Sequence, residues 1–422
     1  MTKANEAVEK TEMAGITEEI QREILEEQLK STRGKLTAEA LERILKSKGT
    51  LSDETDILDR KLTTTKGGYE IAVRDIWDGT LSSTSGGGGG TGLTDTADTK
   101  PGAAMPSGAT VIEADPSKGI VIKDSKNNEW VWIEVPKTTV FTSAQSSTDY
   151  NNIKANLISY ATDYREGKAG QGCNWTDEWY SGCGIADSVT YTTTYQKMLS
   201  SVYTNGGFWI GRYEAGVSDT TPRTEDGAIT DLEAKSQPDM YPFNYVTCSQ
   251  AQTLASKMST DSSKTSSLMF GIQWDLVCKY LEGKDGLEKA DINSDSTNWG
   301  NYEDSEITNL SGKYAICSQT DPYPLGAWNT IPEGYTKPSS GTESWVLLST
   351  GASEYTKKMN IYDFAGNERE WTLENTSYTS DPCAGRGGYY NFHSGYHRPA
   401  SYRGDDSTSF SSSLISFRPS LY

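Results

Sequence analysis

The sequence is poor in long apolar stretches. Hydrophobic residues make up only 35% of its 422 residues, and no uninterrupted apolar run approaches the roughly 20 residues needed to span a bilayer. No apolar segment of the signal-peptide type follows Met1. We therefore expect no membrane span in this chain.

Positive charge is also scarce. The chain has 39 Lys and Arg against 58 Asp and Glu, which gives a formal net charge of -19. Such an excess of negative charge repels both a nucleic-acid backbone and an anionic membrane surface. We expect no nucleic-acid partner.

Cysteine and histidine, the common zinc ligands, are few. The chain has six Cys and two His, with no CxxC motif and no His near the first five Cys, so a zinc site is not expected. Cys173 and Cys183 flank an aromatic loop bounded by glycines. Their spacing is compatible either with a disulfide or with two free thiols.

Glycine and amphipathic aromatic residues are abundant, with 40 Gly, 24 Tyr and 11 Trp against 8 Phe. This composition predicts a loop-rich chain, and its length predicts two or three domains. Composition divides the chain into a head over residues 1–79, a linker over 80–108 and a larger domain over 109–422.

The head is predicted to be a small α+β unit. Apolar residues at helical spacing indicate one helix around Ile16, Ile20 and Ile24, and a second after Thr37. Alternation from Tyr69 through Ile76 and Trp77 predicts a strand or hairpin against those helices. We expect this unit to be an attachment head.

The linker prediction for residues 80–108 depends on composition. The segment contains five consecutive glycines, many Ser and Thr, two prolines and no aromatic residue. Such a sequence buries too little apolar surface to order itself, so we expect a flexible connection.

The larger domain is predicted to be α+β as well, with short strands and few helices. Strands are expected at Trp130–Val135 and Gly207–Tyr213, and helices at Ser249–Met258 and Gln273–Leu281.

Three motifs in this domain carry a family resemblance. They are Asn360-Ile-Tyr-Asp-Phe-Ala-Gly-Asn-Glu-Arg-Glu-Trp-Thr372, Arg386-Gly387-Gly388 and Phe417-Arg418, preceded by the strand Phe208-Trp-Ile-Gly-Arg-Tyr-Glu214. Together they resemble the formylglycine-generating-enzyme (sulfatase-modifying factor) branch of the C-type lectin fold. The resemblance implies that fold for residues 109–422. Ser416 departs from the pattern, because the family has Gly there.

The enzyme activity of that branch is not expected here. Its copper enzymes use two thiolates in the loop after Arg-Gly-Gly, where this chain has Phe392 and His397. Cu(I) needs such soft ligands, so we expect no catalytic residues. A formylglycine-generating oxidase, or another enzyme on the same fold, is the alternative. His393 and His397, with Asp405 and Asp406 after them, form either a hydrolytic or metal site or a set of ordinary surface residues.

The last 36 residues have a restricted composition. From Gly387 to Tyr422 there is no Lys, Glu, Gln, Trp or Met, and every residue present can be encoded by a codon ending in a pyrimidine. Adenine-directed mutagenesis of AAC or AAT codons leaves this pattern, whose alternative is coincidence. With Phe417-Arg418 near the end, the segment resembles the variable proteins of diversity-generating retroelements, which use the same C-type lectin branch.

This resemblance implies a hypervariable ligand-binding protein of the receptor or adhesin type, with a variable region over 386–422. We expect it at the cell surface or outside the cell, or on a phage virion, with a protein or another cell-surface ligand as partner. Tyr with Ser, Asn and Gly is typical of antibody paratopes. The predicted ligand-binding residues are Tyr389, Tyr390, Asn391, Phe392, His393, Ser394, Tyr396, His397, Ser401, Tyr402 and Asp405.

Five of these residues are predicted contact anchors: Tyr390, Phe392, Tyr396, His397 and Tyr402. The arginines of the same segment are instead predicted to support the backbone through carboxylates or carbonyls. They are Arg386, Arg398, Arg403 and Arg418.

No cofactor is expected to be required. Asp363 and Glu370 supply hard oxygen ligands, and the resembled family binds calcium in the equivalent loop. Ion pairs with buried arginines are the alternative use of these acids.

The head also has a short resemblance of its own. Glu9–Leu29 followed by Gly68–Gly79 loosely resembles the soluble helix and first strand of pilin-like surface proteins. It implies tethering to a pilus or envelope, and the alternative is attachment to another carrier such as a phage particle.

Overall fold

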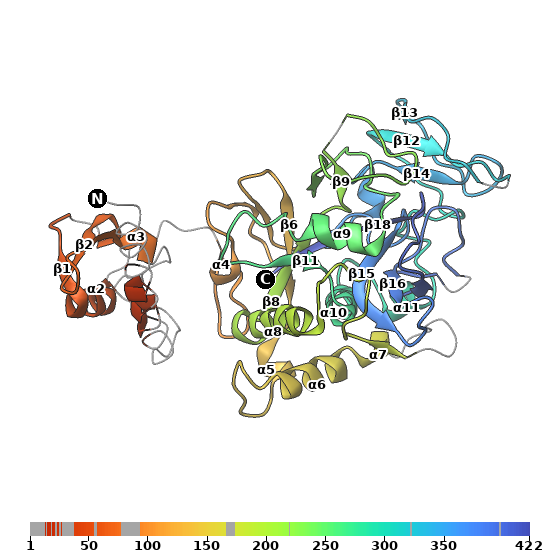
Figure 1. Cartoon of the computed structure of the whole chain (residues 1–422). Helices are drawn as coiled ribbons and strands as arrows, with labels where there is room; N and C mark the ends of the chain where they lie inside the picture. The colour runs from red at the N-terminus through yellow and green to blue at the C-terminus, as the bar shows by residue number, and fades with distance from the viewer. Residues whose placement is uncertain are drawn as a thin grey trace. The chain divides into compact units, whose positions relative to one another are not determined.

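The structure is a computed structural model that describes residues 13, 15–17, 19–21, 23–24, 27, 38–54, 57–76, 93–165, 174–218, 220–320, 323–395 and 398–422. The chain divides into two compact units, Met1–Gly90 and Thr91–Tyr422. Both units combine helices with mainly antiparallel sheets (Figure 1), which confirms the expected α+β class. In the part of the chain described, no helix is both long and apolar enough to cross a membrane.

The smaller unit contains a three-stranded antiparallel sheet in the order β1-β2-β3. Its described elements are α2 (Ala38–Lys48), β1 (Gly49–Leu51), η1 (Ile57–Asp59), β2 (Lys61–Thr64), β3 (Glu70–Ala72) and α3 (Val73–Ile76). Its core joins Ile20 and Ile24 to Leu41 and Leu45 of α2. The second predicted helix is thus confirmed, and Ile20 and Ile24 are buried as expected. The strand predicted to continue to Trp77 instead becomes a helical turn at Val73.

The predicted linker, residues 80–108, extends too far toward the C-terminus. Residues 93–108 belong to the larger unit and include α4 (Pro101–Ala104). The indole of Trp132 donates to Thr99 Oγ1 at 2.8 Å, and that of Trp209 donates to the Ala104 carbonyl at 3.1 Å. Buried indole N–H groups need acceptors, and this aromatic-free segment provides them. The preceding part of the predicted linker, 80–92, lies outside the described residues.

The larger unit is built on a six-stranded sheet in the order β11-β19-β8-β6-β5-β4. The strands are β4 (Thr110–Glu113), β5 (Val121–Lys123), β6 (Glu129–Glu134), β8 (Gly207–Gly211), β11 (Ser266–Leu268) and β19 (Pro419–Leu421). Leu421 pairs with Trp209, and Leu268 pairs with Pro419. The last strand is therefore an interior strand of the central sheet.

A second sheet contains two strands of the segment with restricted composition, at residues 403–406 and 415–417. Its strands follow the order β17-β16-β15-β18, with β7 also paired to β15. They are β7 (Trp175–Thr176), β15 (Arg369–Thr376), β16 (Cys383–Arg386), β17 (Arg403–Asp406) and β18 (Ile415–Phe417). Strands β15 and β18 run parallel, and β16 is antiparallel to β15 and β17. The loop 387–402 thus begins and ends at neighbouring strands.

The remaining elements surround these sheets. The small sheets contain β9 (Gly216–Val217) with β10 (Ala234–Lys235), and β12 (Lys313–Ile316) with β13 (Asn329–Thr330) and β14 (Val346–Leu348). The helices are α5 (Lys137–Val140), α6 (Tyr150–Tyr160), α7 (Thr162–Arg165), α8 (Ser188–Asn205), α9 (Cys248–Ala255), α10 (Gly271–Leu281), α11 (Lys289–Asn293) and η2 (Glu354–Thr356). Strands β6 and β8 and helices α9 and α10 confirm the predicted elements. Helices α6 and α8, which pack side by side (Figure 1), were not predicted.

Candidate functional site

A buried ion network lies beneath the loop 387–402. Arg386 at the end of β16 pairs in register with Arg403 at the start of β17. Both guanidinium groups bind the same two carboxylates. Arg386 contacts Asp275 at 2.8 Å and Glu374 at 3.0 Å, and Arg403 contacts them at 2.6 and 3.1 Å. All four side chains have no exposed surface, so both ends of the loop are held by buried ion pairs.

Arg165 completes this network by contacting Asp177, Asp275 and Glu374. Burial alone would raise the pKa of Glu374, but Arg403, Arg386 and Arg165 lower it from 4.5 to about 2. Three cations therefore balance three carboxylates inside the protein. Such a network is strongly disturbed when one member is removed.

Arg418 has a similar supporting role. Its guanidinium contacts Glu370 at 2.7 Å and donates to the carbonyls of Gly211 and Tyr362. Arg386, Arg403 and Arg418 thus bind carboxylates and carbonyls as the sequence predicted.

Several predicted ligand-binding residues face the interior. Tyr390 has no exposed surface and packs in a cluster with Cys317 and Leu347, and Ser394 is fully buried against the backbone N–H of Ser296. A side chain without exposed surface cannot contact a partner in this conformation. The assignment of Tyr390 as an anchor and of Ser394 as a contact is therefore corrected. Tyr389, Asn391 and Ser401 retain only 8–9% of their surface.

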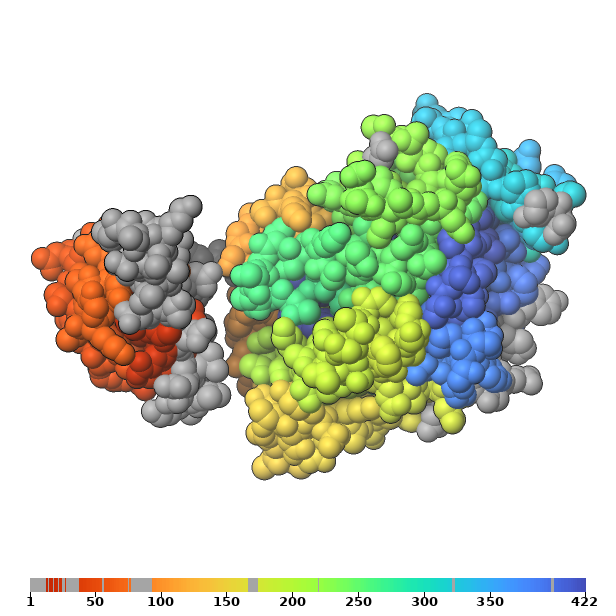
Figure 2. All heavy atoms as spheres, viewed as in Figure 1, coloured from red at the N-terminus to blue at the C-terminus, as the bar shows by residue number. Residues whose placement is uncertain are grey.

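The other predicted contacts lie at or near the surface. Phe392, His393, Tyr402 and Asp405 are half-buried, while Tyr396 and His397 lie outside the described residues. The imidazole of His393 lies 3.0 Å from Asp304 and 3.5 Å from Glu303. In the space-filling view the dark blue atoms of the last part of the chain form a contiguous surface patch (Figure 2).

Arg398 differs from the other arginines of the segment. Its guanidinium carbon lies 4.9 Å from the ring centroid of Tyr389, 4.3 Å from that of Phe392 and 4.8 Å from that of Tyr402. One guanidinium nitrogen donates to the Tyr402 hydroxyl at 2.7 Å. We call these four residues the aromatic box. Arg398, predicted from the sequence to support the backbone, thus lies among three predicted contact residues, a position that the sequence pattern does not indicate.

The two candidate calcium ligands are occupied by protein donors. Asp363 accepts hydrogen bonds from the Gly351 N–H and the Thr356 hydroxyl, both at 2.8 Å, and both oxygens of Glu370 contact Arg418. Burial raises the pKa of Glu370 to about 7, although Arg418 opposes this change. Within the described ranges, no group of three or more His, Cys, Asp or Glu is arranged to hold a metal. Glu370 therefore forms an ion pair with a buried arginine, which was the alternative to calcium binding. Calcium binding at Asp363 and Glu370 stays a prediction.

Cysteine thiols gather at the other end of β16. Cys248 and Cys383 are buried free thiols, and the Tyr180 hydroxyl lies 3.3 Å from Cys248 Sγ. Cys183 is also a buried free thiol, and Cys173, its expected disulfide partner, lies outside the described residues.

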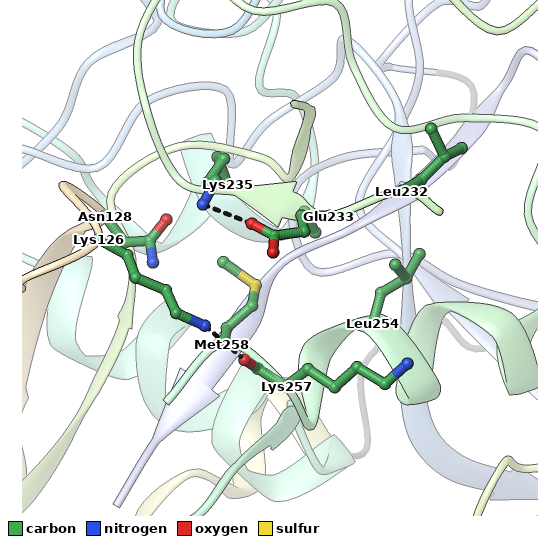
Figure 3. A pocket seen from close by; sticks show the side chains of 9 residues that line it. Lys126, Asn128, Leu232, Glu233, Lys235, Leu254, Lys257 and Met258 are labelled. Carbon is green, nitrogen blue, oxygen red and sulfur yellow. Dashed lines mark hydrogen bonds and ion pairs between the residues drawn. The ribbon is translucent and has the colours of Figure 1, made fainter. Parts of the chain in front are cut away.

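Two cavities open elsewhere on the larger unit. The smaller, of about 70 Å³, is lined by Met258, Lys126 and the ion pair Lys235–Glu233 (Figure 3). It is far below the roughly 300 Å³ at which ligand pockets begin. A more open cavity of about 390 Å³ lies between α6 and α8, where Tyr150 and Trp179 contribute to its wall.

Comparisons with known proteins return only distant similarity. No family model and no curated protein matches the chain. Among solved structures, Treponema denticola variable protein 1 is 12% identical with a TM-score of 0.22, over 75% of this chain and 92% of that one. A crystal structure of CarF is also 12% identical, with a TM-score of 0.17, over 69% of this chain and 85% of that one. Similarity at this level carries no argument about fold or function.

Proposed function

We propose that the chain is a non-enzymatic, hypervariable ligand-binding protein whose larger unit has a C-type lectin fold. The observation that carries this proposal is the restricted composition of residues 387–422, which lack Lys, Glu, Gln, Trp and Met. A segment diversified through its adenines would retain this composition.

The loop 387–402 suits such a role because both of its ends are held in place by the protein interior. Arg386 and Arg403 join them to Asp275 and Glu374 through fully buried ion pairs. Binding residues are commonly placed on loops that a rigid scaffold positions. Exposed side chains between the two arginines can then change without loss of the anchor points.

We define the binding face as the half-buried residues Phe392, His393, Arg398, Tyr402 and Asp405. It offers two aromatic rings, an imidazole and charges of both signs. Aromatic and Arg side chains are enriched among the residues that dominate protein interfaces. We propose a protein or other cell-surface ligand for this face, with the head tethering the chain to a pilus, an envelope or a phage particle.

The oxidase alternative lacks its chemical requirement in this loop. The chain has no cysteine after Cys383, so two thiolates are not available between Arg386 and Tyr422. A soft Cu(I) ion at that position would lack its preferred ligands.

DNA sequencing around the gene tests the proposal. We expect a second, near-identical copy of the stretch encoding Arg386–Tyr422, a reverse transcriptase gene nearby, and differences only where the copy carries adenine. The differing codons should include those of the binding face and exclude those of Arg386, Arg403 and Arg418. Absence of the copy and of the reverse transcriptase gene would overturn the proposal, and the composition would then be coincidental.

A further inference from the structure

Among the described residues, Arg398 has no acidic partner. Arg386, Arg403 and Arg418 each contact a carboxylate within 3.1 Å, whereas no Asp or Glu oxygen among the described residues lies within 4 Å of the Arg398 guanidinium. Its Nε atom is buried and has no hydrogen-bond partner among those residues. Its charge is therefore not compensated by an ion pair in the part of the chain described.

The aromatic box holds this cation in place. Tyr389, Phe392 and Tyr402 surround the guanidinium at 4.3–4.9 Å, within the range of cation–π attraction. Tyr389 is itself fixed from another direction by Arg369, whose guanidinium carbon lies 5.3 Å from the ring and whose Nη1 contacts Asp406 at 2.9 Å. The Arg398 head group is thus ordered before any ligand arrives.

A guanidinium ordered in this way is suited to a carboxylate. Its planar set of N–H donors matches the two oxygens of a carboxylate, and such bidentate contacts are among the strongest hydrogen bonds in proteins. The three rings around it carry no negative charge of their own. Among the described residues, no carboxylate of the protein competes with a ligand's carboxylate for the Arg398 guanidinium.

The surroundings restrict the ligand further. Glu303 and Asp304 flank His393, and the Glu303 N–H donates to the Phe392 carbonyl at 3.1 Å. These acids disfavour several negative charges arriving together, and the net charge of -19 repels a polyanion such as nucleic acid. A single acidic side chain on a protein segment meets less repulsion.

From this geometry we infer that Arg398 binds an Asp or Glu carboxylate of a partner protein, with Tyr389, Phe392 and Tyr402 packing beside the bound segment. The inference deepens the proposed function and rests on it. It assigns the recognition of a ligand's charge to an arginine that the sequence pattern predicts to be a supporting residue.

Selection of random peptides displayed on phage tests the inference. The full chain is compared with Arg398→Gln, Arg398→Lys and the control Arg223→Gln. Arg223 also lies over an aromatic ring, Phe243 at 5.6 Å, but belongs to neither the box nor the binding face. We expect peptides selected on the native chain to share an Asp or Glu at one position, and those selected on Arg223→Gln to retain it. Peptides selected on Arg398→Gln should lose this preference, and Arg398→Lys should weaken it.

Affinities then separate the possible outcomes. Arg398→Gln should weaken the binding of the best peptide at least tenfold, and replacing the acidic residue of that peptide by its amide should weaken binding by a similar factor. The two changes together should weaken binding little more than either change alone. Peptides without an acidic preference, or a preference that survives in Arg398→Gln, would overturn the inference and leave the proposed function standing. Failure to select any peptide on the native chain, with circular dichroism showing a folded protein, would count against both.

Discussion

The ion network and the aromatic box use the same residue type in opposite ways. Arg386 and Arg403 are fully buried against Asp275 and Glu374, whereas Arg398, in the loop between them, is half-buried among three rings. In the network the cation holds the scaffold together. In the box it remains available to a ligand, because no carboxylate of the described residues faces it.

The largest effect should follow from breaking the network. Arg403→Met leaves only Arg386 and Arg165 to balance the three buried carboxylates, so one buried negative charge is uncompensated. We expect a loss of about 3–5 kcal/mol in the free energy of unfolding. Urea denaturation measures it. Arg398→Gln should change the same quantity by less than about 1 kcal/mol, because no ion pair is broken. Similar losses for the two variants would contradict the distinction between a stabilising arginine in the network and a non-stabilising arginine in the box.

Two tyrosines of the loop test the same contrast between buried and partly exposed residues. Tyr390 has no exposed surface, so Tyr390→Ala should create a cavity and cost about 3 kcal/mol in the free energy of unfolding. Tyr402 is half-buried, and Tyr402→Ala should cost about 1 kcal/mol while weakening ligand binding. Thermal unfolding and peptide affinity, measured together, separate the two roles. A Tyr390→Ala protein of native stability would show that the ring is not part of the core.

The third effect is a dependence on acid pH. The folded-state pKa of Glu374 is about 2 against an ordinary 4.5, so its ionisation stabilises the fold above pH 4.5. We expect on the order of 3 kcal/mol of stability to be lost as the pH falls from 4.5 toward 2. Glu370, with a raised pKa of about 7, acts with the opposite sign and reduces stability as the pH rises from 4.5 to 7.

Denaturation at a series of pH values checks this prediction. Glu374→Gln should be less stable near neutrality, and its stability should change less between pH 4.5 and 2 than that of the native chain. An unchanged slope in this window would mean that other carboxylates cause the acid dependence.

Local patterns predicted some elements well and missed others for identifiable reasons. Helix α2 was predicted because Leu41, Ile44 and Leu45 repeat at helical spacing within a charged sequence. Helix α8 also buries a helical stripe, which includes Tyr191, Tyr195 and Met198, but its many Ser and Thr residues have weak helix propensity. Its Asp187 N-cap and the packing of that stripe favour the helix nonetheless.

The site was predicted only in part. The loop with restricted composition is visible in the sequence, but the side of the loop that each residue faces is not. Tyr389, Tyr390 and Phe392 look equivalent as a run of aromatic residues, yet only Tyr390 is fully buried while Phe392 remains half-exposed. Irregular backbone has no fixed period from which to predict these directions.

The sequence by itself determined the excess of negative charge, the α+β class and the unusual composition after Arg386, because these follow from residue counts and from spacing between near neighbours. The tertiary structure decided which arginines are buried in ion pairs and which one lies among aromatic rings. Asp275 lies 111 residues from Arg386 and 128 from Arg403 along the chain. Only folding brings these charges together, and it places three rings rather than a carboxylate around Arg398.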